Sequence, residues 1–212
     1  MNLNAAADHS HSLQNIISNS FYSRSALDVA RDLLGKMLVR RYDGQVMAGL
    51  ILEAEAYQGE EDLGCHAKAG LTPRTRIMYG SPGHAYIYFT YGMHWMLNAV
   101  TSLEGSPAAV LIRGMEPVIG LDAMRSLRPQ PKSSQPGALH KGWTDGPAKL
   151  CQALALNGTL NGVDLCNGKT DVWIADAGID VPEGEVLRTP RIGMNTVPEP
   201  WFSIPWRFVW KG

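Results

Sequence analysis

A chain of 212 residues is long enough to bury one well-filled hydrophobic core, so we expect one domain rather than several. The hydrophobic share of 45% and the charged share of 18% are typical of a soluble globular protein, and no apolar run is long enough to span a bilayer, which excludes a membrane-embedded class. The formal net charge of -1 does not by itself indicate a protein that binds nucleic acid.

The start of the chain predicts a lead-in to the domain. Residues 1–20 are polar and rich in Asn, Ser and His, so we expect a partly disordered segment there and a single domain over residues 21–212. No export signal precedes the domain, and the three cysteines form no Cys-x-x-Cys spacing, so we expect an intracellular protein with reduced thiols. His9 and His11 form the only close histidine pair, and no metal or phosphate-loop motif occurs, so no metal or other cofactor is expected.

The first predicted elements are a helix and a hairpin. Ser25 is followed three residues later by an acidic residue, and apolar residues then recur at helical spacing up to Gly35, which predicts a helix between these two residues. Strands at Met37–Arg41 and Gln45–Ala56 flank an Asp-Gly pair at positions 43 and 44, which is a strong hairpin signal.

A loop and a second hairpin follow. Cys65–Gly83 contains several proline and glycine breakers and is expected to be a loop. Ala85–Thr90 and Trp95–Thr101 alternate like paired strands, with a turn near Tyr91-Gly-Met93. The remaining predicted elements are a buried strand at Ala108–Arg113, a short helix at Gly120–Leu127, a mobile loop at Arg128–Trp143, a helix from Pro147 to about Leu156 capped by Thr144 or Asp145, and strands at Val172–Ala175 and Arg207–Trp210.

Two carboxylates in the first hairpin are the most informative side chains. Strand alternation would place Ile51, Glu53, Glu55 and Tyr57 on one face, away from an apolar face made by Leu50, Leu52, Ala54 and Ala56. A carboxylate beside aromatic rings suits hydrolysis of a bond to a sugar carbon, and the rings could stack on a nucleobase. The alternative is that Glu55 is a surface glutamate on the wet face of its strand.

Other polar and aromatic residues are open to two interpretations each. His66 could form a hydrogen-bonding pocket wall or be an inert loop histidine. Tyr86 and Tyr88 could fill a core or form a ligand platform. Arg113 ends an apolar strand, where a guanidinium needs a carboxylate partner. Lys149 lies in the first turn of a predicted helix, which is a weak signal for a phosphate site.

Several spaced motifs in a fixed order then indicate a family. They are Glu53-Ala-Glu55-Ala-Tyr57, the loop with His66, Thr72-Pro-Arg74-x-Arg76-x-Met78, Tyr86-x-Tyr88-x-x-Tyr91-Gly-Met93, Asn98, Ala109-Val-Leu-Ile-Arg113-x-x-Glu116-Pro117, Gly146-Pro-x-Lys149-Leu-Cys-Gln152-Ala and Arg191-Ile192-Gly193. With these motifs, the chain from about residue 21 to its end resembles the alkyladenine (3-methyladenine) DNA glycosylases, the base-excision repair enzymes outside the helix-hairpin-helix group.

The resemblance implies roles for the residues that match. Glu55 matches the general base, which activates the water that attacks C1′ of a flipped nucleotide. Arg113 and the main-chain carbonyl of Ile192 match the groups that help hold this water. The residues that match the walls of the base pocket are Tyr57, His66, Tyr88 and Asn98, and the last of these is expected to reject the amino group of normal guanine.

The resemblance also implies a DNA-binding surface. Tyr91 matches the wedge that fills the gap left in the duplex, and Met93 lies beside it in the same turn. Lys149 matches a helix-start lysine near the DNA backbone, and Arg74 and Arg76 add positive charge near the pocket. The expected partner is double-stranded DNA that contains damaged purines. We expect the protein to be a monomer that does not associate with a membrane.

The fold and activity expected from these observations are specific. We expect an α+β fold with a single compact domain, in which helices flank a curved antiparallel sheet and a protruding hairpin inserts into DNA. The expected activity is that of a monofunctional DNA-3-methyladenine glycosylase, which hydrolyses the N-glycosidic bond of alkylated or deaminated purines (3-methyladenine, hypoxanthine and ethenoadenine types) and leaves an abasic site, because no lysine is a candidate for a Schiff-base nucleophile.

Two other functions stay open at the level of sequence. A carbohydrate or nucleoside hydrolase could use Glu53 and Glu55 as a carboxylate pair, since same-face neighbours on a strand lie roughly 6–7 Å apart. A non-catalytic module that binds nucleic acid would use the same aromatic and basic residues without chemistry.

Overall fold

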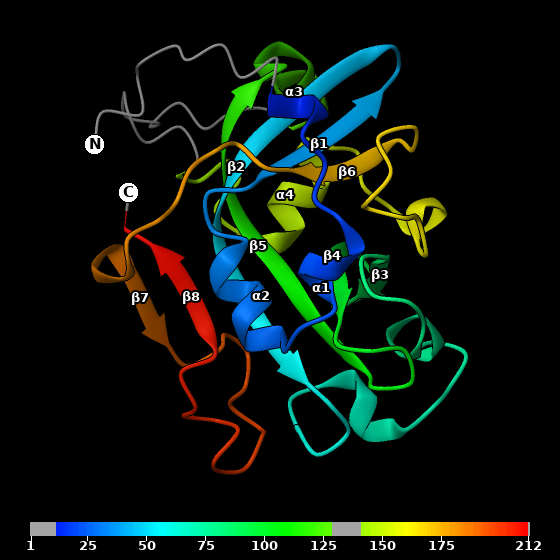
Figure 1. The fold of residues 1–212 in the computed structure, drawn as a ribbon, viewed down its shortest axis with the longest axis vertical. Coiled ribbons are helices and arrows are strands. Elements are labelled where there is room, and N and C mark those ends of the chain that lie inside the picture. Colours follow the sequence, from blue (N-terminus) through cyan, green and yellow to red (C-terminus); the bar gives the residue numbers. More distant parts are fainter. Residues whose placement is uncertain (1–11, 129–140, 212) are drawn as a thin grey trace.

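The structure is a computed structural model that describes residues 12–128 and 141–211. Its strands are β1 (Met37–Tyr42), β2 (Gln45–Gln58), β3 (Ala85–Thr90), β4 (His94–Thr101), β5 (Ala108–Ile119), β6 (Val172–Ala175), β7 (Val186–Thr189) and β8 (Arg207–Trp210). Its α-helices are α1 (Asn19–Tyr22), α2 (Ala26–Asp32), α3 (Leu121–Leu127) and α4 (Pro147–Ala153). The expected single domain of α+β type, with an antiparallel sheet flanked by helices, is confirmed (Figure 1).

Strand β2 is the centre of this sheet. Six strands follow one another in the order β3-β4-β5-β2-β1-β6, and β7 and β8 branch off because β8 also pairs with β2. The first half of β2 pairs with β1 up to Leu50, and Glu53–Glu55 pair with β8 instead. On its other edge β2 pairs with β5 along most of its length. Figure 1 shows β2 running between β5 and the β7–β8 pair.

Three irregularities interrupt the pairing of β2 with β5, and the two next to Glu53 change which residues share a face. Ile51 pairs with Met115 but Glu53 pairs with Gly114, so Leu52 is an extra residue on β2. Ala54 then pairs with Ile112, so Arg113 is an extra residue on β5. These two insertions cancel, and the third irregularity lies between Ala48 and Gly49, where Val118 is an extra residue on β5.

The extra residue Leu52 makes part of the predicted alternation wrong. Ile51 packs in the main hydrophobic core together with Leu52, Ala54 and Ala56, whereas Leu50 packs in a separate cluster with residues of β1 and β6. The predicted grouping of Ile51 with Glu53 therefore fails, because one additional residue reverses the side to which the preceding residues point. The alternative interpretation of Glu55 as a surface glutamate is wrong as well, since Glu55 is fully buried.

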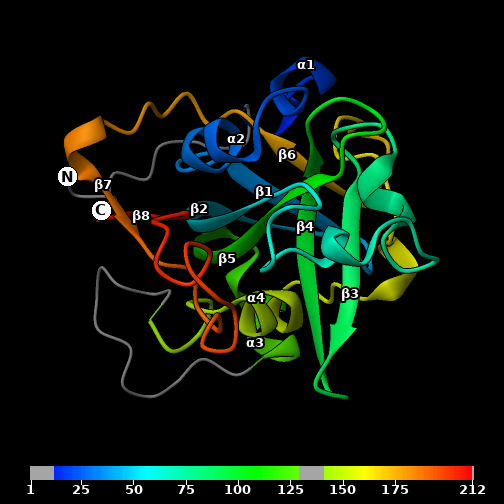
Figure 2. The same cartoon turned by 90° about the horizontal axis from the view of Figure 1, so that it is seen from below.

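The helices cover both sides of the sheet, with α1 and α2 on one side and α3 and α4 on the other (Figure 2). Helix α2 begins as predicted: the Ser25 hydroxyl accepts the Asp28 N–H at 3.2 Å, and Gly35 follows the helix with φ of 79°. Helix α4 begins at Pro147, as predicted, but its cap residue is Gly146.

The predicted cap of α4 by Thr144 or Asp145 is therefore wrong. The Thr144 hydroxyl donates to the carbonyl of Met115, and Asp145 accepts from the Gly142 N–H and from Lys149. Both side chains are engaged elsewhere, so neither one binds the first N–H groups of the helix. The helix also ends at Ala153, three residues before the predicted Leu156.

Both predicted hairpins are present. The β1–β2 turn consists of Asp43 and Gly44, which both have positive φ, as the tight turn between twisted strands requires. The β3–β4 hairpin turns at Tyr91 and Gly92, also with positive φ, and Figure 2 shows it extending past α4 and α3. Tyr91 is 82% exposed and Met93 is 65% exposed at this tip.

Some segments differ from expectation. The loop Cys65–Gly83 contains two 3-10 helices, η2 (His66–Ala69) and η3 (Arg76–Tyr79), and β7 was not predicted. Residues 1–11 of the predicted disordered start, with His9 and His11, and residues 129–140 of the predicted mobile loop lie outside the described residues. The described part of that start contains a 3-10 helix, Ser12–Gln14, and buried Ile17. No helix within residues 12–128 and 141–211 is long and apolar enough to cross a membrane.

Candidate functional site

A cavity of about 330 Å³ opens on the face of the sheet formed by β2, β3, β4 and β5. It gathers side chains that lie far apart in the sequence, and seven of the predicted site residues line it. These residues are Tyr57, His66, Tyr88, Tyr91, Asn98, Arg113 and Ile192. The strands supply its floor, and the loops that carry His66 and Ile192 form its walls.

Glu55 is not among the residues that line this cavity, but its three hydrogen-bond partners are. Its side chain has no exposed surface, and three donors hold the carboxylate. Oε1 accepts the main-chain N–H of Ile192 at 2.7 Å, and Oε2 accepts the Tyr57 hydroxyl at 2.9 Å and Nη1 of Arg113 at 3.2 Å. A carboxylate offers about four acceptor positions, so one stays available for a further donor such as water.

Opposing effects act on the acidity of Glu55. Burial raises the pKa of the Glu55 carboxyl, because desolvation disfavours the anion, and Arg113 and the Ile192 N–H oppose this rise without cancelling it. Burial lowers the pKa of Arg113, but the two carboxylates of Glu55 and Glu53 outweigh burial and leave that pKa raised. The pair therefore consists of a firmly charged guanidinium and a carboxylate that is easier to protonate than an exposed one.

The alternation of side chains along β5 places Arg113 on the cavity side, within reach of Glu55. Arg113 has no partner residue on β2, and its side chain points to the same side as those of Leu111 and Ala109, toward the cavity. Gly114 lies opposite Glu53, whose carboxylate accepts a hydrogen bond from Arg113.

Glu53 is engaged by two arginines rather than free. Its Oε1 accepts Nε of Arg113 at 2.7 Å and Nε of Arg207 at 2.7 Å. Arg207 comes from β8, directly opposite Glu55 in the register, and sequence reasoning gave it no role. Nothing local in the sequence Trp-Arg-Phe-Val indicates this contact, because it depends on β8 pairing with a strand about 150 residues earlier.

The aromatic walls are packed against one another. The rings of His66 and Tyr88 meet edge to face at 4.5 Å, and Nδ1 of His66 bonds to the Tyr86 hydroxyl at 2.9 Å. Burial, aided by Arg74, lowers the pKa of His66 to about 4, so the imidazole is neutral at pH 7. Burial raises the pKa of Tyr88 to about 12, so this phenol stays protonated.

Asn98 forms part of the floor of the cavity. It is buried on β4, and its Nδ2 donates to the main-chain carbonyl of Tyr86 at 3.0 Å across the hairpin. This contact fixes the amide orientation, with the side chain facing the cavity.

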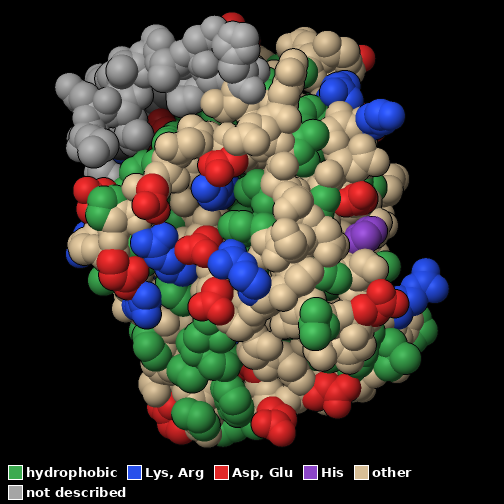
Figure 3. All heavy atoms as spheres, viewed as in Figure 1, with side chains coloured by type: hydrophobic (Ala, Val, Ile, Leu, Met, Phe, Trp, Pro, Cys, Tyr) green, Lys and Arg blue, Asp and Glu red, His purple; other side chains and the backbone are tan. Residues whose placement is uncertain are grey.

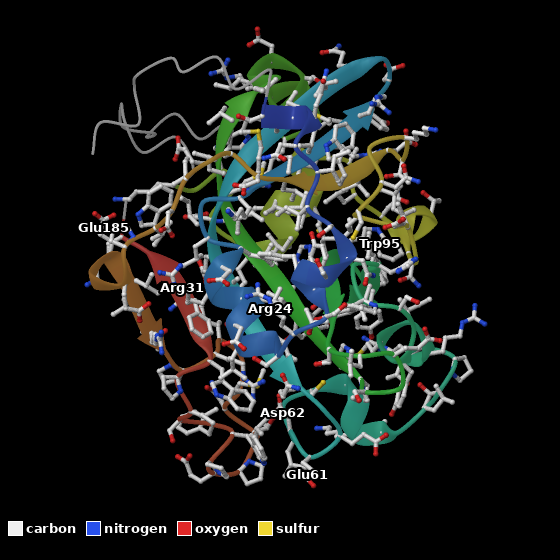
Figure 4. All side chains as sticks on the ribbon, viewed as in Figure 1. Arg24, Arg31, Glu61, Asp62, Trp95 and Glu185 are labelled. Carbon is white, nitrogen blue, oxygen red and sulfur yellow. The ribbon has the colours of Figure 1, made fainter. Side chains whose placement is uncertain are left out.

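A buried ion pair holds the loop that contributes Ile192. Arg191 donates to both oxygens of Asp62 at 2.6 and 2.8 Å, and both side chains have no exposed surface. The Arg191 guanidinium also lies 4.7 Å from the centre of the Tyr57 ring and 5.2 Å from that of Trp206. The sequence did not indicate a role for Asp62. The only signal for this ion pair was that Arg191 lies beside Ile192 in a family motif. Figure 4 labels Asp62 close to the segment that carries this loop.

The other predicted DNA-binding residues do not line the cavity. Arg74 and Arg76 are exposed, and the Arg74 guanidinium lies 5.1 Å from the centre of the Tyr88 ring, at the edge of the site. Met93 is at the hairpin tip. Lys149 bonds to Asp145 at 2.7 Å on the exposed side of α4. Among the residues that the structure describes, no group of three His, Cys, Asp or Glu side chains could hold a metal ion.

A buried carboxylate beside a cavity with aromatic walls fits the class of glycosidases, in which an anion acts on a sugar carbon. The comparison with known families is more specific. The sequence profile described as Methylpurine-DNA glycosylase (MPG) matches residues 20–212.

Related sequences support the same assignment. Similar proteins from Methanocella arvoryzae (45% identical over 196 residues, 92% of each chain), Myxococcus xanthus (46% over 193 residues, 91% of this chain and 89% of the relative) and Carboxydothermus hydrogenoformans (43% over 196 residues, 92% and 95%) all carry the name putative 3-methyladenine DNA glycosylase. The chain belongs to the methylpurine-DNA glycosylase family. The resemblance in the motifs, and the expected class of a DNA glycosylase of base excision repair that acts on alkylated purines, are thereby confirmed.

Proposed function

We propose that the protein is a monofunctional glycosylase that flips alkylated or deaminated purines out of duplex DNA into the aromatic cavity and hydrolyses their N-glycosidic bond. The substrates would include 3-methyladenine, hypoxanthine and ethenoadenine. The observation that carries the proposal is the position of Glu55, which is buried and held by three donors that line the cavity, with one acceptor position left.

In this mechanism Glu55 is the general base. Water bound to the remaining acceptor position attacks C1′ of the deoxyribose, and Glu55 takes its proton. The C1′–N bond breaks, its electron pair leaves with the purine, and an abasic site remains. Arg113 and the main-chain carbonyl of Ile192 help to hold the water. Within the described residues no lysine lines the cavity, which supports hydrolysis by water rather than by an amine.

The charge and shape of the cavity suit an alkylated purine. Such a base carries positive charge, and the faces of Tyr57 and Tyr88 attract a cation by on the order of 0.5–2 kcal/mol. His66 is neutral at pH 7 because its pKa is lowered by burial, so it adds a hydrogen-bonding group without repelling a cationic base. A cationic base is also a good leaving group, which reduces the need for a general acid. Asn98 at the floor would reject the amino group of normal guanine.

The β3–β4 hairpin would enter the duplex from the minor groove. Extrusion of a base costs a few kcal/mol, and an inserted side chain offsets part of this free energy. Tyr91 is suited to that role because it is 82% exposed and has φ of 52°. A bulky residue with positive φ is uncommon, and such backbone strain often marks a functional position. Met93 would contact the duplex beside it.

Surface charge supports binding on the hairpin side. On the opposite face, α2 and its surroundings carry basic and acidic side chains next to one another (Figure 3), in ion pairs such as Arg24–Asp32 and Arg31–Glu183. Arg74 is exposed at the edge of the cavity, and Arg76 is exposed two residues further along the chain, so both are available to phosphates. Lys149 would join them if DNA displaces Asp145. The protein would act as a monomer.

The alternative of a carboxylate pair that cleaves free sugars or nucleosides has less support. It needs Glu53 as a second acid or base, but the Glu53 carboxylate is bound to Arg113 and Arg207. A non-catalytic binding module would not need a buried carboxylate at the cavity, since burial of a charge opposes folding.

A comparison of substrates tests the proposal. The protein is incubated with duplexes that contain one hypoxanthine or one ethenoadenine, with the matched undamaged duplex, and with the free nucleosides. Release of the free base and an alkali-labile, intact strand from the damaged duplexes alone is expected. Cleavage of nucleosides alone would favour the sugar hydrolase, tight binding without release would favour the binding module, and strand nicking during the reaction would contradict the monofunctional mechanism.

A further inference from the structure

The carboxylate of Glu53 is placed between two guanidinium groups at the back of the site. One oxygen, Oε1, accepts Nε of Arg113 and Nε of Arg207, both at 2.7 Å. Arg113 then uses Nη1 to reach Glu55 at 3.2 Å. The four side chains form a row in the order Arg207, Glu53, Arg113 and Glu55, in which positive and negative charges alternate.

Arg207 has no contact with the cavity but is fixed by its strand. It lies opposite Glu55 on β8 and opposite Thr189 on β7. Its Nη1 donates to the Thr189 hydroxyl at 3.0 Å, and its side chain is 22% exposed. The β7–β8 pair branches from the sheet at the point where β1 stops pairing with β2, and so it brings a basic side chain to a site formed mainly by β2 and β5.

We propose that Arg207 is a positioning residue that acts through Glu53: it neutralises Glu53, so that Glu53 orients Arg113 toward the Glu55 carboxylate without adding net negative charge beside it. The inference rests on the proposed function of Glu55 as the general base, and it assigns to β8 control over the pH at which this base ionises.

The charges around Glu55 determine the sign of the effect. The ionisable groups that face Glu55 are Glu53 and Tyr57 from β2, Tyr88 from β3, Arg113 from β5, Arg191 from the loop before Ile192, and Arg207 from β8 through Glu53. Burial raises the pKa of Glu55, Arg113 opposes the rise, and Glu53 adds to it.

Two substitutions at opposite ends of this interaction should therefore act in opposite directions. Arg207→Gln leaves Glu53 with one cation in place of two, so the surroundings of Glu55 become more negative and its pKa rises further. Glu53→Gln removes an anion and leaves two cations, so the pKa of Glu55 falls. A purely structural role for either residue would lower stability or the maximal rate but would not produce shifts of opposite sign.

The experiment measures the ionisation of Glu55 in two independent ways. The first is a pH titration of the ¹³C-labelled Glu55 carboxyl by NMR in the DNA-free protein, with Glu55→Gln to assign the signal. The second is the pH dependence of single-turnover excision from a hypoxanthine duplex. The variants are Arg207→Gln, Glu53→Gln, the double variant and Arg207→Lys. Arg188→Gln is the matched control, because Arg188 lies on β7 of the same hairpin and pairs with exposed Glu183.

We expect the midpoint to rise by about half to one pH unit in Arg207→Gln and to fall by a similar amount in Glu53→Gln, because the perturbing charge is one residue removed from Glu55. The double variant and Arg207→Lys should stay near wild type, as should Arg188→Gln. If Arg207→Gln does not fold, Glu53→Gln and Arg207→Lys still supply the sign and the rescue.

The two readouts separate the possible failures. An NMR midpoint that is unchanged in Arg207→Gln and in Glu53→Gln, or that moves in the same direction in both, would overturn the inference. An NMR midpoint that shifts as expected, while excision keeps its wild-type pH dependence in every variant, would support the charge balance and instead refute the role of Glu55 as the base.

Discussion

The buried pair of Asp62 and Arg191 allows the sharpest prediction about stability. The Asp62 carboxylate accepts hydrogen bonds from Nη1 and Nη2 of Arg191 at 2.6 and 2.8 Å, from the Gly64 N–H at 2.9 Å and from the Gln58 N–H at 3.2 Å. Asp62→Asn places an amide NH₂ among these donors and leaves the Arg191 charge buried without a counter-ion. Both side chains have no exposed surface, so water cannot replace the lost partner.

The magnitude follows from this burial. Removing one partner of a buried ion pair costs about 3–5 kcal/mol of unfolding free energy. For a chain of this length each kcal/mol lowers the melting temperature by about 2–4 °C, so Asp62→Asn should melt roughly 6–20 °C below wild type. Arg191 keeps its bond to the carbonyl of Ala56 and its stacking on Tyr57, so we expect a folded but weakened protein.

Thermal unfolding followed by circular dichroism provides the measurement, and a surface ion pair provides the control. Asp122 pairs with Arg125 but is 96% exposed, so Asp122→Asn should change the unfolding free energy by less than about 1 kcal/mol. Excision by Asp62→Asn should also fall, because Arg191 anchors the loop whose Ile192 N–H holds Glu55. A loss of stability no larger than that of Asp122→Asn would refute the reasoning.

Three further predictions concern DNA binding and pH. Tyr91→Ala should keep the melting temperature but weaken the flipped complex roughly 5- to 150-fold, the equivalent of about 1–3 kcal/mol of lost stacking. A fluorescent base at the lesion reports flipping, and Leu103→Ala, an exposed residue just after β4, is the control. Equal flipping by wild type and both variants would contradict the role of Tyr91 as the wedge. Duplex affinity should fall steeply with added salt, and Arg76→Gln should reduce the slope of log affinity against log salt by about 1. Fluorescence anisotropy at several salt concentrations measures this slope. An unchanged slope would show that Arg76 does not contact the DNA backbone. The rate of excision should decline as the pH falls through a midpoint above the ordinary carboxyl pKa of 4.5, because burial raises the pKa of Glu55 and only its anion accepts a proton. A midpoint at or below 4.5 in the pH profile would argue against a buried base.

Local signals in the sequence predicted most of the fold. The Asp-Gly pair at positions 43 and 44, the Ser25 cap and the Tyr91-Gly-Met93 turn each depend on a few neighbouring residues, and all three are present in the structure. The β3–β4 hairpin was predicted because its strands are adjacent in the chain. Strand β7 was not predicted, since it is four residues long and pairs with a strand that follows a long loop.

The failures arise from contacts between distant segments. The bulge residues Leu52 and Arg113 are set by how β2 pairs with β5, and no local pattern marks an inserted residue. The cap of α4 was misassigned because Thr144 bonds to Met115 on another strand. In the same way, the sequence did not indicate that two arginines would bind Glu53.

The candidate site was predicted in most of its residues, but not in its physical setting. The motifs of the family brought together Glu55, Arg113 and the three ring residues that line one cavity. The pattern of the strand nevertheless left a surface glutamate open as an alternative, whereas Glu55 is buried. Burial depends on the loop with Ile192 and on its anchor Asp62, which are about 130 residues apart and meet only in the folded chain.

The central claim is that Glu55 activates water for attack on the sugar of a flipped purine. The most direct test is the single-turnover rate of base release from a hypoxanthine duplex by wild type and by Glu55→Gln, with binding and base flipping measured on the same complexes. A general base contributes about 10²–10⁴-fold, so Glu55→Gln should bind and flip the lesion like wild type and release it slower by that factor. Release within a few-fold of wild type, by a variant that is folded and binds DNA, would contradict the account.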